Sequence, residues 1–143
     1  MYIYFRQKDS QKLWKYKVLV ILMKRILIVD DDHDITLAFK RGLEGPEFSV
    51  DVYNDPSLAL SEFKPNTYHL LLLDVRMPKM NGFELYREVQ KVDKSVKVCF
   101  ITAFEVYYQA LKEVFPTLEI DCFIKKPIEM SELAKKVKLE LNS

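Results

Sequence analysis

The stretch ILIVDDD at residues 26–32 sets four apolar residues directly before three carboxylates. Residues 70–74, LLLLD, repeat the arrangement with a single Asp. Short unbroken apolar runs are typical of strands that are buried on both faces of a parallel sheet. Ligands of such sheets bind beyond the carboxyl ends of the strands. The two stretches therefore predict a buried parallel sheet with an acidic site at one edge.

Outward from these stretches, apolar runs continue to alternate with amphipathic segments. Three further strand-like runs lie at residues 48–52, 96–101 and 120–124. Helical spacing of apolar residues recurs in five segments, at residues 35–39, 59–63, 85–92, 107–114 and 130–141. The alternation predicts an α/β fold, a doubly wound (βα)5 parallel sheet. Ser49, Asp51 and Asp121 interrupt the second and fifth strands, which places these strands at the sheet edges and favours the flavodoxin-like order 2-1-3-4-5.

Composition and charge narrow the class of protein. The chain has 143 residues, 49% hydrophobic and 30% charged, as expected of one globular domain. Residues 1–22 carry a net charge of +4 within a total of +1, so the rest is mildly acidic, which argues against nucleic acid as a direct partner. The apolar run at 18–23 is too short for a transmembrane segment. Cys99 and Cys122 lack metal-site spacing, and we expect both to be reduced core residues of a cytoplasmic protein.

Carboxylates from two strand ends converge at the predicted edge. Asp30 and Asp74 each follow an apolar strand directly, with Asp31 beside them. Such a cluster repels itself unless a cation is present, and Mg²⁺ suits a few carboxylates with water and a phosphate oxygen. Asp32 and Asp34 are interpreted instead as favourable charges at a helix start. His33 is expected to face solvent rather than to bind a softer metal.

Two other strands end in polar residues at the same edge of the sheet. Thr102 follows the run at 96–101, and Lys126 follows the run at 120–124 after one residue. Pro127 disfavours a helical conformation for Lys126, and an extended Lys can reach across to the carboxylates. A Lys at a strand end is usually a solvated charge, but the conjunction of four polar strand ends favours a shared site.

With these residues in place, the sequence resembles the receiver domain of two-component response regulators, in the stand-alone form of chemotaxis receivers. The matching motifs are residues 26–32, 73–78 with Asn81-Gly82, 101–103 and Lys126-Pro127. The resemblance extends over residues 24–141. Each motif alone is weak, but their order and spacing together are specific.

The resemblance implies a role for each matching residue. Asp74 is the expected phosphoryl acceptor, which takes the group from a sensor histidine kinase or a phosphotransfer protein. Asp30 and Asp31 are the acidic pair that positions Mg²⁺. Asp74 and the backbone carbonyl of Arg76 complete the expected metal ligands. The protein is then a signalling module, not an enzyme, although it catalyses its own phosphorylation and dephosphorylation.

Further family positions concern the phosphoryl group and its consequences. Lys126 and Thr102 are expected to contact phosphoryl oxygens. Thr102 and Phe123 match the family's switch pair, with Phe, which has no hydroxyl, where Tyr is commoner. A buried strand aromatic is the competing interpretation of Phe123. Arg76 and Phe104 flank the expected path of hydrolytic water and would tune dephosphorylation.

The domain is predicted to span residues 23–143, with residues 1–22 a basic and aromatic N-terminal extension or a mis-assigned start. Only Asn142-Ser143 follow the last helix, so we expect no attached output domain. A downstream protein would then bind the face formed by the segments at 107–114, 120–124 and 130–141.

Three other functions compete with this interpretation. A haloacid-dehalogenase-type phosphatase would use Asp30 and Asp32, but Asp34 replaces its expected Thr or Val, and Asp74 is left unexplained. A flavodoxin-like flavin module needs a hydroxyl-rich phosphate loop after the first strand, where this chain has carboxylates. A receiver-shaped module that is not regulated by phosphorylation stays open.

Overall fold

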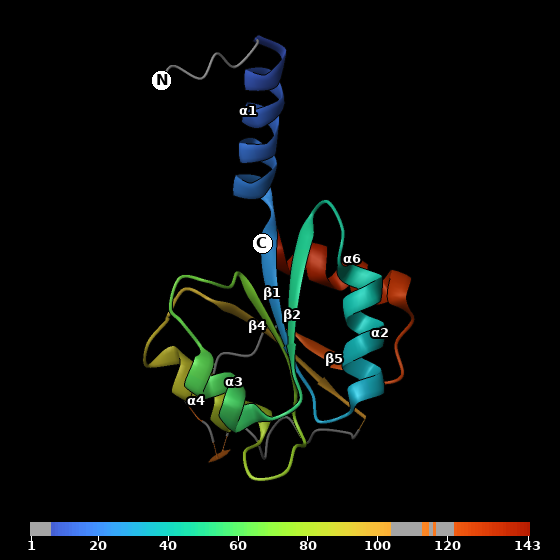
Figure 1. The fold of residues 1–143 in the computed structure, drawn as a ribbon. Helices are drawn as coiled ribbons and strands as arrows, with labels where there is room; N and C mark the ends of the chain where they lie inside the picture. Colours follow the sequence, from blue (N-terminus) through green and yellow to red (C-terminus); the bar gives the residue numbers. More distant parts are fainter. Residues whose placement is uncertain (1–6, 104–112, 115, 117–121) are drawn as a thin grey trace.

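The computed structural model describes residues 7–103, 113–114, 116 and 122–143, with side chains described from Ser10 onward. Its centre is a sheet of five parallel strands in the order β2-β1-β3-β4-β5, as predicted (Figure 1). The strands are β1 (Lys24–Val29), β2 (Phe48–Tyr53), β3 (Leu70–Asp74), β4 (Lys97–Thr102) and β5 (Phe123–Lys125). The fifth strand begins later than the predicted run at 120–124, of which residues 120–121 lie outside the described residues.

Helices cover both faces of the sheet. α2 (His33–Leu43) and α6 (Met130–Leu141) lie on one face, and α3 (Pro56–Glu62) and α4 (Gly82–Gln90) lie on the other (Figure 1). The helix predicted at 107–114 falls outside the described residues, except for Glu113 and Val114, which are helical. The doubly wound arrangement predicted from the alternating pattern is confirmed.

The core is divided by the sheet into two layers. Every residue of β3 is buried, and alternate leucines face opposite layers. Leu71 and Leu73 pack towards α3 and α4, whereas Leu70 and Leu72 pack towards α2 and α6. Continuous apolar sequence in this strand therefore reflects burial on both faces. The edge strand β2 is only partly buried, in agreement with its interleaved polar residues.

Side-chain caps fix where three of the helices begin. The Asp32 carboxylate accepts hydrogen bonds from the backbone N–H groups of Asp34 and Ile35, so the interpretation of Asp32 as a helix-start residue is confirmed. Asp55 caps α3 ahead of Pro56, and Asn81 forms a capping box with Glu84 at the start of α4. Such caps stabilise a helix by about 1 kcal/mol each.

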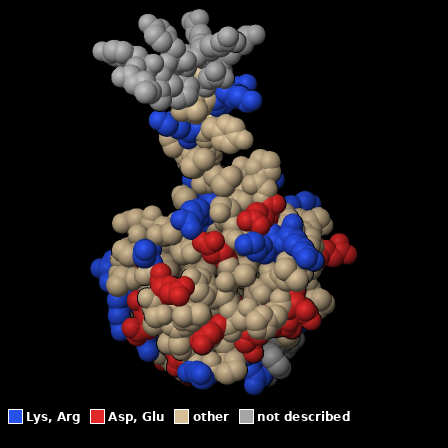
Figure 2. All heavy atoms as spheres, viewed as in Figure 1, with Lys and Arg blue, Asp and Glu red and all other residues tan. Residues whose placement is uncertain are grey.

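An additional helix, α1 (Gln7–Leu22), stands away from the domain at the amino end of β1 (Figures 1 and 2). Its apolar side chains are mostly exposed, including Trp14 and Ile21. Leu19 and Leu22 border a shallow hollow that Phe48 also lines. Across the part of the chain that the structure describes, no helix combines the length and apolar character needed to cross a bilayer.

The expectation of two reduced cysteines is wrong. Cys99 and Cys122 form a disulfide, although 23 residues separate them in the sequence. The sheet register explains the pairing, because Phe100 lies opposite Phe123 and the preceding residues are therefore neighbours across β4 and β5. Sequence spacing alone does not show this proximity.

Candidate functional site

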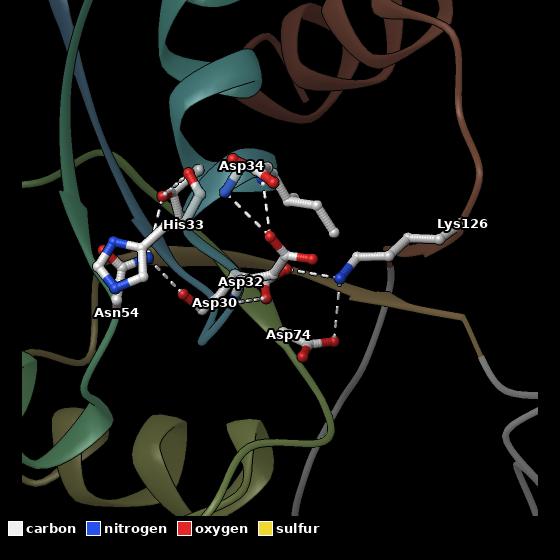
Figure 3. A network of polar contacts seen from close by, with 9 residues as sticks. Asp30, Asp32, His33, Asp34, Asn54, Asp74 and Lys126 are labelled. Atoms are coloured by element: carbon white, nitrogen blue, oxygen red, sulfur yellow. Dashed lines mark hydrogen bonds and ion pairs between the residues drawn. The ribbon is translucent and has the colours of Figure 1, made fainter.

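Four strand ends meet at the carboxyl edge of the sheet. Asp30 follows β1, Asp74 ends β3, Thr102 ends β4 and Lys126 follows β5. Asp30, Asp74 and Thr102 are all buried. Figure 3 shows Asp30 and Asp74 with the Lys126 side chain directed at both of them. The structure therefore gathers these four predicted site residues in one place.

Lys126 links three of the strands through its side chain and backbone. Its Nζ lies 2.5 Å from Asp30 Oδ2 and 3.5 Å from Asp74 Oδ1. The Lys126 side chain is only 13% exposed. Its backbone N–H donates to the Thr102 carbonyl at 2.9 Å, and the bond to Pro127 is cis. The ammonium is thus a fixed positive charge between two buried carboxylates, not a solvated surface charge.

Asp30 is held in place by neighbouring donors as well as by Lys126. Its Oδ1 accepts a hydrogen bond from the Asp32 backbone N–H at 3.0 Å. The Asp30 backbone carbonyl accepts from Asn54 Nδ2 at 2.8 Å, and the same amide group donates to Thr36 Oγ1 at 3.0 Å. Asn54 was not predicted as a site residue. Its signal was present, since it is a polar residue directly after β2, at the same sheet edge.

Electrostatics at Asp74 make its carboxyl group hold a proton more tightly than an ordinary aspartate in the absence of a cation. Burial raises the pKa of Asp74 to about 6, and the negative charge of Asp30 adds to the shift. The Lys126 charge acts in the opposite direction but does not cancel it, and Asp31 raises the pKa a little further. Three carboxylates around one ammonium leave an excess of negative charge. A bound cation would offset that excess.

The carboxylates form an oxygen-only donor set. One carboxylate oxygen each from Asp30, Asp31 and Asp74 lies within 4.8 Å of the other two. Asp30 and Asp74 are buried, whereas Asp31 is exposed and opens the group to water. Hard divalent cations such as Mg²⁺ prefer oxygen ligands and retain several waters, so these residues fit that ion.

The remaining predicted positions lie around this cluster. Arg76 is exposed and lines a hollow together with Met77 and Pro78. Phe123 is half-buried, and its ring centroid lies 5.7 Å from that of Phe100. Phe104 lies outside the described residues. His33 is exposed, as expected.

The backbone of Gly82 lies close to the end of β3. Its N–H donates to the Val75 carbonyl at 3.0 Å. A Cβ atom at position 82 would lie 2.3 Å from the Asp74 carbonyl oxygen, a distance that backbone atoms do not tolerate. The absence of a side chain at Gly82 lets the start of α4 pack directly beneath Asp74.

Comparisons with known proteins agree with this architecture. Residues 26–138 match the model of the response regulator receiver domain. The response regulator receiver protein CpdR of Brucella abortus is 35% identical over 82 residues, which cover 57% of this chain and 68% of CpdR. The transcriptional regulatory protein RprY of Bacteroides fragilis is 31% identical over 113 residues, which cover 79% of this chain. The chain spans only about half the length of RprY, since the match covers 47% of that protein.

Two solved structures show the same fold. A CheY-like receiver domain protein from Methanospirillum hungatei has 27% identity and a TM-score of 0.71, with 84% of this chain and 94% of that chain covered. The CheX-CheY-BeF3-Mg complex from Borrelia burgdorferi matches with 25% identity and a TM-score of 0.69, covering 81% of this chain and 87% of that chain. The family model covers well over half of the sequence, and the chain belongs to the response regulator receiver domain family.

Proposed function

We propose that this protein is the phosphoacceptor module of a two-component phosphorelay and that Asp74 receives the phosphoryl group with Mg²⁺ present. The observation that carries the proposal is the convergence of Asp30, Asp31 and Asp74 with the buried ammonium of Lys126. An exposed Asp31 beside two buried carboxylates gives a cation both protein oxygens and water.

Asp74 is the proposed nucleophile because its carboxylate ends the central strand and its Oδ1 is the oxygen nearer to Lys126. A new Asp74 Oδ–phosphorus bond would form as the phosphorus–nitrogen bond of a phosphohistidine breaks. The imidazole then leaves and takes up a proton. Only the carboxylate form of Asp74 can attack the phosphorus, so nearby positive charges that keep Asp74 deprotonated support the reaction.

Mg²⁺, held by Asp30, Asp31, Asp74 and the Arg76 backbone carbonyl, would neutralise charge on the phosphoryl oxygens. Lys126 is the proposed donor to one phosphoryl oxygen, and Thr102 to another. In this structure Asp30 and Asp74 share the Lys126 ammonium. A phosphoryl group on Asp74 would compete with Asp30 for that ammonium and so redistribute charge at the end of β5.

The Borrelia relative supports the cation, since its structure is a complex that contains BeF3 and Mg. That complex also contains CheX, so a receiver of this fold binds another protein. For this chain we propose a cytoplasmic location, a histidine kinase or phosphotransfer donor and a downstream protein. The proposed output face includes β5 and α6, with Thr102 and Phe123 as the switch pair.

The test is incubation with a small phosphodonor such as acetyl phosphate, followed by intact-mass measurement. We expect one added phosphoryl group with Mg²⁺ and none in excess chelator. Asp74→Asn should abolish the addition. Asp34→Asn is the matched control, because Asp34 is an exposed carboxylate in the first turn of α2, outside the cluster. Phosphate that persists in Asp74→Asn would contradict the assignment and favour an interaction module without phosphorylation.

A further inference from the structure

The disulfide ties the short edge strand to its neighbour. Cys99 lies within β4 and Cys122 lies directly before β5, with their Cα atoms 4.6 Å apart. The Phe100 N–H donates to the Cys122 carbonyl at 3.0 Å, so the backbone is also paired at this point. Cys99 is fully buried, whereas Cys122 is half-buried. Cys122 is therefore the less buried partner of the disulfide.

β5 lies between this covalent bond and the proposed phosphorylation site. The strand has three residues, and Lys126 follows it immediately. The Lys126 backbone is bonded to the Thr102 carbonyl, and its ammonium lies at Asp30 and Asp74. A change that loosens the start of β5 therefore acts on the position of Lys126 three residues further on.

We propose that Cys99 and Cys122 are a redox modification site, a dithiol–disulfide pair whose oxidation fixes β5 on β4 and holds Lys126 at the carboxylates. This inference rests on the proposed phosphoryl transfer. The reductant would be a dithiol, either a small molecule or part of another protein. The oxidant would be a low-molecular-weight disulfide. Intracellular disulfides are often of this reversible, sensing kind.

Reduction is expected to begin at the half-buried Cys122. A thiolate of the reductant attacks Sγ of Cys122, the bond between the two sulfurs breaks, and Cys99 leaves with the electron pair and takes up a proton. The second thiol of the reductant then attacks the mixed disulfide and releases Cys122 as a thiol. Two electrons and two protons pass to the cysteines, and the reductant becomes a disulfide.

The reduced domain is expected to be less stable and to accept phosphate more slowly. Without the cross-link, the long connection between β4 and β5 regains conformational freedom in the unfolded chain. We expect a melting temperature lower by about 10 °C. A less constrained Lys126 should slow phosphoryl incorporation roughly three- to ten-fold, because small errors in position are costly in transfer reactions.

The experiment compares the full chain in two redox states, treated with oxidised glutathione or with a phosphine reductant. The chain has two cysteines, so alkylation and mass measurement count zero or two thiols. Phosphoryl incorporation from acetyl phosphate with Mg²⁺ and the melting temperature are then measured for each state. The Cys99→Ala/Cys122→Ala variant, with Cys122→Ser as a milder second variant, should match the reduced parent in both measurements and should not respond to redox treatment.

Several results would overturn the proposal. They are two alkylatable thiols after oxidation, equal incorporation rates in the two states, or a rate in the double variant that still depends on the reductant. A fourth is tight binding of one Zn²⁺ by the reduced protein that restores the oxidised melting temperature, since the two sulfurs and a Glu140 oxygen lie within 4.8 Å of one another. If neither redox state takes up a phosphoryl group, the proposed function is contradicted. The thiol count and the melting temperature would still test whether the disulfide forms and stabilises the domain.

Discussion

The two ends of the sheet each hold an aspartate beside a cation, but in different surroundings. At the carboxyl end, Lys126 and Asp30 have side chains that are 13% and 3% exposed. At the amino end, Arg25 lies 2.8 Å from Asp51, and these side chains are 45% and 40% exposed. Tyr68 also donates to Asp51 at 2.7 Å, and the Arg25 guanidinium lies over the Tyr68 ring.

The difference shows which ion pair is suited to chemistry. Water screens the exposed pair at the amino end, and such pairs contribute about 0–1 kcal/mol to stability. Arg25 and Tyr68 both contact the Asp51 carboxylate, so the polar groups of this pair have partners within the protein. Burial and the hydrogen bond to Asp51 raise the pKa of Tyr68 well above its usual value. At the carboxyl end, burial leaves excess negative charge and raises the pKa of Asp74. An incoming cation can offset that excess negative charge and so prepare this end for an anionic phosphoryl group.

Replacing the basic side chain at each end of the sheet should give the largest difference in the rate of phosphoryl incorporation. We expect Lys126→Met to slow phosphoryl incorporation at least about ten-fold, because a fixed positive charge near the transferring group is lost. The fold and Mg²⁺ binding should be largely retained. Arg25→Met should change the rate less than about two-fold, since its partner is an exposed carboxylate far from Asp74. Equal losses in the two variants would remove the distinction between the ends, and a collapse of the Lys126→Met melting temperature would favour a structural role.

The raised pKa of Asp74 gives a pH dependence of stability. An acid with a folded pKa of about 6 and an ordinary value of 3.8 binds its proton more tightly in the folded state. The free energy of unfolding should therefore fall as the pH rises from about 4 to about 6, by roughly 2–3 kcal/mol without metal. Asp74→Asn should remove that fall and be more stable than the parent above pH 6.

Denaturant unfolding of the parent and variants at several pH values, in chelator, measures this effect. Asp51→Asn is the control at the amino end. It removes the acceptor shared by Arg25 and Tyr68, so it should gain no stability at any pH. A constant difference between the parent and Asp74→Asn across the pH range would argue against the raised pKa.

A smaller effect is expected on the lifetime of the phosphorylated form. We propose that Arg76 and Phe104 shield the phosphoryl group from water. Arg76→Ala should then speed the decay of phosphorylated Asp74 several-fold through the loss of a covering cation. Phe104→Ala and the double variant extend the series, and Arg25→Ala is the control at the other end of the sheet. Decay at the parental rate in all of them would exclude shielding.

Removal of α1 at the amino end should have the smallest effect on stability and on phosphoryl incorporation. A chain that begins at Met23 lacks α1, whose described apolar side chains are mostly exposed and whose last turn borders the hollow beside Phe48. We expect its melting temperature to stay within about 3 °C of the parent and its phosphoryl incorporation to be unchanged. Unfolding of this shorter chain would show that α1 belongs to the core and that the domain does not begin at residue 23.

The parts of the fold that could be predicted are those with a local signal. The unbroken leucines of β3 reveal burial on both faces, and the Asp55-Pro56 pair marks the start of α3 in the sequence itself. The strand order followed from the polar residues within the edge strands. Asp30, Asp74, Thr102 and Lys126 could be placed at one edge because each stands at the end of a strand.

The parts that were missed depend on contacts between distant residues. Cys99 and Cys122 meet only through the register of β4 and β5. The Asn54 side chain donates to the carbonyl of Asp30, which lies 24 residues earlier in the sequence, so the polar residue after β2 is visible in the sequence but its partner is not. α1 has no apolar stripe that separates a buried face from an exposed one, so the sequence of residues 1–22 does not predict a helix there.

The close packing at Gly82 restricts which amino acids can occupy this position without disrupting the fold. Its missing side chain leaves room for the Asp74 carbonyl, whereas an added Cβ at Gly45 would meet nothing within 4 Å and one at Gly42 would meet the flexible end of Met130. In a library of all single substitutions selected for folded protein, position 45 should accept most residues and position 42 a few small ones. Position 82 should return glycine alone, so that the most constrained site beside the acceptor carries no functional group.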